Sequence, residues 1–138
     1  MIKKKLLNSK RLRRIDGGFS FIPHRFLTDG FLAYLSQREL LLYLFLILVS
    51  DRHGLSYYAY DSICSLLQFS LDDYIEARDG LMEKDLIAFD GKVFQVLSLP
   101  EKVVDTSRKL LKNPEEIKRH DPATIHQLAV HSLGENHG

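Results

Sequence analysis

Two short apolar runs, residues 86–89 and 93–97, flank the tripeptide Asp90-Gly91-Lys92. An Asp-Gly pair between such runs is a strong signal for a β-hairpin with a type I′ turn, in which both central residues have positive φ. From Leu71 to about Lys84, apolar residues recur at steps of three and four, which predicts a helix. The sequence therefore predicts a helix followed directly by a two-stranded hairpin.

A shorter helix is predicted just before this one. It runs through Ile63 and its neighbouring leucines, with Asp61 as the expected N-cap. Gln68-Phe69-Ser70 forms a tight connection, because Ser70 followed by Asp73 is typical of a helix cap. A short helix and a longer helix joined by about three residues are typical of a helix-turn-helix, and the hairpin would be its wing.

Further elements are predicted upstream. Ser36 and Glu39 form a capping-box pattern, so a helix should begin there and run to about Asp51, ending near Gly54. The other expected elements are an extended segment over residues 19–22, a helix over residues 24–35 that Gly30 weakens, and a short strand over residues 55–58.

A chain of 138 residues has room for one domain of ordinary size plus tails. We expect a mainly α protein with a small β-hairpin (α+β), folded as a winged helix-turn-helix. The expected parts are a basic flexible arm (residues 1–18), the winged helix-turn-helix domain (19–100) and a weakly helical C-terminal tail (101–138).

The stretch from Asp61 to Ile87 resembles bacterial winged-helix modules. It is similar to the N-terminal domains of plasmid and phage replication initiators and of primosomal replication proteins, and more weakly to helix-turn-helix proteins of mobile elements. The resemblance covers residues 19–99 and implies a role in replication initiation, transcription regulation or transposon accessory function. Two positions depart from the pattern: Asp85 and Phe69 stand where glycine is usual.

Charge is strongly segregated along the chain. Residues 1–14 carry a net charge of +7 without an acid, whereas residues 15–100 hold six basic and twelve acidic residues. Because neutralisation of phosphates supplies most nonspecific DNA affinity, the arm is the main candidate for contact with double-stranded DNA. The alternative is a solvated basic tail. The candidate arm residues are Lys3, Lys4, Lys5, Lys10, Arg11, Arg13 and Arg14.

The expected recognition helix is a poor match for DNA. Over residues 71–84 it carries five acids against Arg78 and Lys84, and acids beside phosphates are repelled. The alternative function is therefore a protein–protein interaction module that uses this acidic surface. If the helix does contact DNA, selectivity would come from residues around the turn and the wing. These candidates are Gln68, Ser70, Tyr74, Arg78 and Lys92.

The longest apolar run covers residues 40–49, which begin at Leu40 and end at Val49. It is too short for a membrane span, which needs roughly 20 residues. Because it is apolar on every face of its helix, a homodimer interface is one interpretation. The other is that the first helix and the C-terminal tail cover the surplus.

No residue pattern indicates catalysis. The six histidines lack metal-ligand spacing, no glycine-rich phosphate loop is present, and Cys64 is expected to be a buried apolar residue. Tyr57, Tyr58 and Tyr60 are able to stack on bases, although tyrosines around a short strand usually pack. We expect a cytoplasmic, non-catalytic protein without cofactor or metal.

Overall fold

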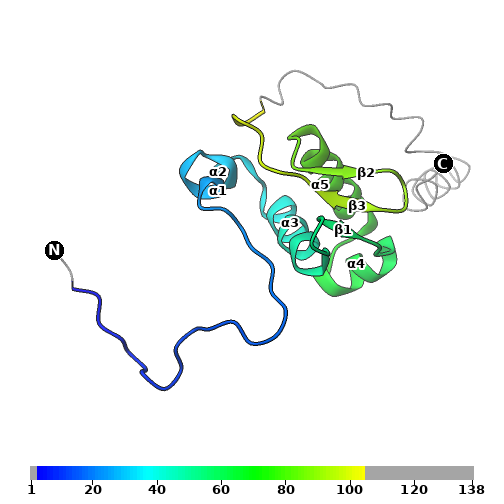
Figure 1. Cartoon of the computed structure of the whole chain (residues 1–138). Coiled ribbons are helices and arrows are strands. Elements are labelled where there is room, and N and C mark those ends of the chain that lie inside the picture. Colours follow the sequence, from blue (N-terminus) through cyan, green and yellow to red (C-terminus); the bar gives the residue numbers. More distant parts are fainter. Residues whose placement is uncertain (1–2, 105–138) are drawn as a thin grey trace, which may run out of the picture.

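The computed structural model describes residues 3–104, which form a mainly helical body with a small antiparallel sheet (Figure 1). Residues 3–24, including the expected extended segment 19–22, form no helix or strand. The predicted C-terminal tail begins at residue 101, and its part beyond residue 104 lies outside the described residues. In chain order the elements are α1 (Arg25–Thr28), α2 (Phe31–Tyr34), α3 (Gln37–Val49), β1 (Leu55–Ser56), α4 (Tyr60–Leu67), α5 (Leu71–Glu83), β2 (Ile87–Phe89) and β3 (Phe94–Val96).

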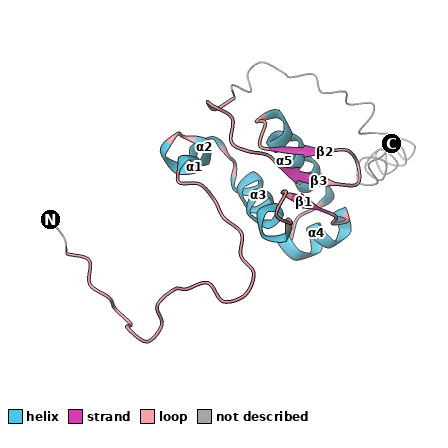
Figure 2. Ribbon diagram, in the orientation of Figure 1, coloured by secondary structure: helices cyan, strands magenta, loops and turns pink. Residues whose placement is uncertain are grey.

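The sheet has three strands in the order β1-β3-β2, one more than the hairpin alone (Figure 2). β1 is shorter than the predicted strand and pairs with β3, Ser56 opposite Phe94. Gly54 closes this edge: its carbonyl oxygen accepts from the Val96 N–H at 2.8 Å, and its φ is +83°. A Cβ at Gly54 would lie 2.5 Å from the Val96 carbonyl oxygen, so only glycine fits.

The hairpin between β2 and β3 forms as predicted, but its turn differs. Phe89 pairs with Phe94, which leaves a four-residue loop, and within this loop only Gly91 has positive φ. The prediction of a type I′ turn is therefore wrong. Instead, Asp90 Oδ1 accepts hydrogen bonds from the backbone N–H groups of Lys92 and Val93, and these bonds fold the loop.

Helices α3 and α5 pack against each other at the centre of the body. Both predicted capping boxes are confirmed: Ser36 and Glu39 exchange hydrogen bonds at the start of α3, as Ser70 and Asp73 do at the start of α5. Glu39 also forms a mostly buried ion pair with Lys84. This carboxylate lies against α5 at Gly80, where a Cβ would overlap Glu39 Oε2, which explains a glycine inside a helix.

The core lies between these two helices, α4 and the sheet. Leu42, Leu46, Ile63, Leu81 and Phe94 are fully buried there. Among the described residues no helix is long and apolar enough to span a membrane.

Two helix starts differ from prediction. The expected helix over residues 24–35 is divided into α1 and α2, because Gly30 takes a left-handed conformation between them. The helix α4 begins at Tyr60 with Ala59 as its N-cap, so Asp61 lies in the first turn and is not the cap. Its negative charge still suits the positive end of the helix dipole there.

Two non-glycine residues end helices in the left-handed region. Asp85 (φ 61°) follows α5, with the Leu86 N–H bonded to the Leu81 carbonyl and the Asp85 N–H to the Met82 carbonyl, which is a Schellman motif. Gln68 (φ 57°) ends α4. The position that would suit glycine is therefore Gln68, not Phe69.

Candidate functional site

The seven basic residues of the arm are all exposed. The arm has no helix or strand between residues 3 and 24, and Figure 1 shows it running away from the helices. Its hydrogen bonds are local: Asn8 accepts from the backbone N–H groups of Lys10 and Arg11. Within residues 3–104, none of the arm cations forms an ion pair with an acid. The arm thus presents a concentrated positive charge to solvent.

Two predicted DNA-contact residues of α5, Tyr74 and Arg78, are buried, each with 1% of its surface exposed. The Arg78 guanidinium bonds Asp79 through Nε and Nη2, both at 3.0 Å from Oδ1. It also lies 5.5 Å from the ring centre of Tyr74 and 5.3 Å from that of Phe89. This burial counts against base reading by either side chain, and their assignment as DNA contacts stays a prediction.

Gln68 and Ser70, the two predicted DNA contacts at the turn, are exposed, but both have a role in ending or capping a helix. The Ser70 hydroxyl oxygen accepts from the Asp73 N–H at 3.1 Å, and the Asp73 carboxylate accepts from the Ser70 N–H at 3.1 Å. Hydrogen bonding of the Asp73 carboxylate to the Ser70 backbone, and secondly to the Ser70 side chain, lowers the pKa of Asp73. Gln68 holds the left-handed end of α4.

The outward face of α5 is entirely acidic. Its exposed residues repeat at steps of four, three and four, which places them on one side of the helix. With Arg78 inside, no basic side chain of α5 interrupts them. We call this set the acidic ridge: Asp72, Glu76, Asp79 and Glu83.

Lys92 is exposed at the hairpin loop, where Asp90 fixes the backbone. The hydrogen bonds from Val93 and Lys92 lower the pKa of Asp90, so its carboxylate remains charged and keeps these bonds at neutral pH. The predicted position of Lys92 at the tip of the hairpin agrees with this geometry.

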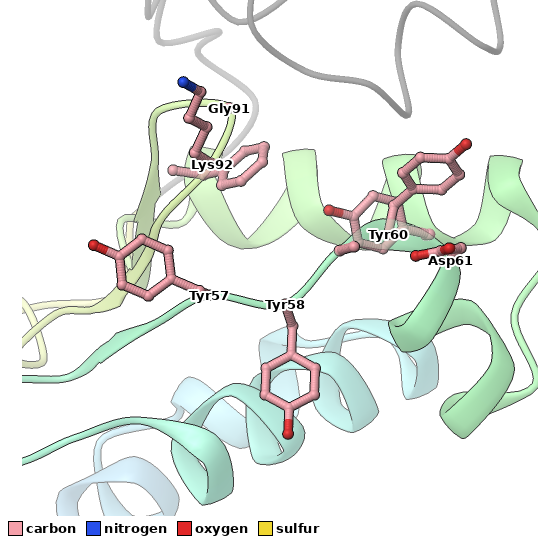
Figure 3. A pocket seen from close by; sticks show the side chains of 9 residues that line it. Tyr57, Tyr58, Tyr60, Asp61, Gly91 and Lys92 are labelled. Atoms are coloured by element: carbon pink, nitrogen blue, oxygen red, sulfur yellow. The ribbon is translucent and has the colours of Figure 1, made fainter.

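Beside Lys92 lies an open pocket of about 390 Å³ between the hairpin loop, the segment after β1 and the starts of α4 and α5 (Figure 3). Tyr58 turns away from it toward α3 and makes an edge contact with Phe45, with ring centres 5.1 Å apart. The sequence indicates the tyrosines as possible base contacts, but it gives no sign that Asp61 and Phe89 belong to the same site. Only the tertiary fold brings them together, because they are distant in the chain. The lining residues are Tyr57, Tyr58, Ala59, Tyr60, Asp61, Tyr74, Phe89, Gly91 and Lys92.

Two further kinds of candidate group are possible metal ligands and the cysteine Cys64. Residues 3–104 contain no group of three His, Cys, Asp or Glu side chains placed to hold a metal ion. Burial raises the pKa of the Cys64 thiol, and the charges of Asp61 and Asp73 raise it further. A thiol in this environment is a weak nucleophile at neutral pH.

The apolar helix α3 is mostly covered. Leu42, Tyr43, Leu46 and Ile47 are buried, whereas Leu48 is 73% exposed and Leu41 is also exposed. The homodimer through this helix stays a prediction.

Comparisons with known protein families, with curated proteins and with solved structures gave no match to this chain.

Proposed function

We propose that this chain is a non-catalytic winged helix-turn-helix protein that binds double-stranded DNA through its basic arm. The observation that carries the proposal is the arm itself: seven exposed cations that form no ion pair with an acid of residues 3–104. Such a segment neutralises phosphates and releases their counterions, which favours binding without base-specific contacts.

The order of the elements supports the winged-helix assignment. The series α3, β1, α4, α5, β2, β3 places a short helix and a longer helix before a hairpin, with a first strand added to its edge. α1 and α2 precede this unit. A role in replication initiation, transcription regulation or a mobile element follows from the sequence resemblance and belongs to this proposal.

The binding geometry differs from that of a helix inserted into the major groove. The acidic ridge would face phosphates if α5 entered the groove, and Arg78 is too buried to offset it. We therefore assign the DNA contact to the arm and to Lys92, with the acidic ridge turned away from the duplex.

The test is a salt titration of duplex binding with the full chain. With all seven arm cations engaged, a log–log plot of affinity against salt has a slope of roughly −6. Replacing the seven cations by glutamine should remove most of the slope and most of the affinity, leaving only the contribution of Lys92. A variant with the arm residues in scrambled order is the matched control and should bind as the original does. An unchanged slope after neutralisation of the arm contradicts the proposal.

A second candidate function is binding of a basic protein partner at the acidic ridge. The specific observation is that all four exposed positions on the outer face of α5 are acids. If this second function is correct, the full chain would not bind duplex DNA even at low salt. A synthetic basic peptide would bind it, and the double change Glu76→Gln and Glu83→Gln would weaken that binding. Both residues are exposed, so the fold should not change.

A further inference from the structure

The pocket between the hairpin loop and the start of α4 has the dimensions of a small-ligand site. Its volume of about 390 Å³ falls within the roughly 300–1,000 Å³ typical of such sites. It is lined mainly by aromatic side chains, with a basic group at one side and an acidic group at the other (Figure 3). This combination suits a flat, partly polar ligand that carries a negative charge.

The aromatic side chains of the pocket differ in how tightly neighbouring side chains pack against them. Phe89 stacks on Phe94 with ring centres 4.2 Å apart, and the buried Arg78 guanidinium lies against it, so this wall is fixed. Tyr57 is 77% exposed and makes no ring contact with another described residue. Tyr57 is therefore the ring on which a base can stack without displacing part of the core.

The two charged groups of the pocket come from different elements. Lys92 extends from the hairpin loop, and a lysine ammonium is a compact charge suited to a phosphate. Asp61 lies in the first turn of α4, where its Oδ1 accepts from the Ser62 N–H at 2.8 Å. A carboxylate accepts hydrogen bonds from N–H groups, and guanine is the base that presents two adjacent N–H donors on its pairing edge.

We propose that this pocket binds one unpaired guanine nucleotide of a single-stranded nucleic acid. The base stacks on Tyr57, its pairing edge donates to Asp61, and its phosphate lies at Lys92. A paired guanine is excluded, because its N–H donors are already used by cytosine. This inference extends the proposed function: the arm holds the duplex, and the pocket recognises a strand end or an opened junction beside it.

The experiment uses the full chain with two kinds of DNA hairpin, one with a blunt end and one with a short overhang. The overhang contains guanine in one version and cytosine in the other. The guanine overhang should raise the affinity by about tenfold over the blunt hairpin, as expected for one stacked base. Tyr57→Ala should remove this gain and leave blunt binding unchanged. Tyr34→Ala is the matched control, since Tyr34 is also exposed but lies on α2, outside the pocket.

Two further measurements report on stacking and on base choice. 2-Aminopurine in the overhang should lose fluorescence on binding the original chain but not Tyr57→Ala, because stacking quenches it. Asp61→Asn should reduce the preference for guanine over cytosine. Lys92→Met should weaken overhang binding by a larger factor than blunt binding, to which Lys92 also contributes. Free guanosine monophosphate should compete only at far higher concentration than the overhang, since it lacks the strand that the arm holds.

The outcomes separate this inference from the proposed function. Equal affinity for the blunt and overhang hairpins, or a gain that persists in Tyr57→Ala, overturns the pocket assignment while duplex binding by the arm stands. Free guanosine monophosphate that binds as tightly as the overhang overturns the assignment to a strand. Failure of both hairpins to bind overturns the proposed function as well.

Discussion

The arm over residues 3–18 and the helix α5 are both rich in charge, but the structure uses their charges in opposite ways. All seven arm cations face solvent, whereas the one arginine of α5 is buried and its outward face carries only acids. Counting charges gives the sign of the net charge of each region but not which side chains are exposed. Burial distinguishes the two regions. The exposed arm cations are able to attract a polyanion, while the buried Arg78 side chain contacts only other parts of the protein. Each prediction below tests this difference.

The largest effect is expected from Arg78→Ala. It removes a buried cation that contacts two aromatic rings and leaves a cavity, so the free energy of unfolding should fall by about 3–5 kcal/mol. Arg14→Ala in the arm should leave it unchanged. Urea denaturation measures both. If Arg78→Ala kept its stability and lost DNA affinity, Arg78 would be a DNA-contact residue after all.

The next largest loss of stability is expected from Gly80→Ala. The added methyl group overlaps the Glu39 carboxylate, which is held by Lys84 and by the Ser36 N–H. Displacing this carboxylate should cost about 2–4 kcal/mol of unfolding free energy. Gly18→Ala is the matched control in the arm, because a Cβ there meets nothing within 4 Å. Equal melting temperatures for the two variants would contradict the described contact between α3 and α5.

Acid should destabilise the body through three aspartates. Hydrogen bonds from Leu55 and His53 lower the pKa of Asp51, as bonds from other backbone groups do for Asp73 and Asp90. A carboxylate whose pKa is lowered by folding stabilises the folded state at any pH above its unfolded pKa of 3.8. This contribution is lost as the pH falls through the pKa that the carboxylate has in the folded state. The melting temperature should drop between about pH 5 and about pH 2. The triple change to asparagine should flatten this drop, and an equally steep drop would count against these bonds.

The smallest effect is a gain in stability from Asp85→Gly. Asp85 is in the left-handed region that glycine adopts without a steric penalty, so the change should stabilise the body by about 0.5–1 kcal/mol. Asp16→Gly in the arm should give no gain. A loss of stability in Asp85→Gly would show that the aspartate side chain supports the end of α5 more than its conformation costs.

Local patterns in the sequence predicted the local structure well. The two capping boxes, the helix over α5 and the hairpin around Gly91 each depend on residues within a few positions of one another. The errors have local causes too. A single glycine divided the first helix, and Asp90 folded the hairpin loop with its side chain where a second positive φ was expected.

The site was harder to predict than the fold. Arg78 was named as a DNA contact because it is a basic residue of the expected recognition helix, although its spacing places it with the apolar residues Tyr74 and Leu81. Its charge favoured the surface, and the structure buries it with these apolar neighbours. The pocket was not predictable as a unit, since its residues come from two stretches far apart in the chain, 57–61 and 89–92. The signals in the sequence were the tyrosines near a short strand and Lys92 at the hairpin loop.

The sequence by itself determined the charged arm, the helix starts at Ser36 and Ser70 and the hairpin, because each follows from interactions between near neighbours. Only the tertiary structure decided that Arg78 is buried, that Gly80 makes room for Glu39 and that Asp61 and Lys92 border one pocket. These facts depend on how α3, α5 and the sheet pack together. Packing joins residues far apart in the chain, and no local pattern records which ones will meet.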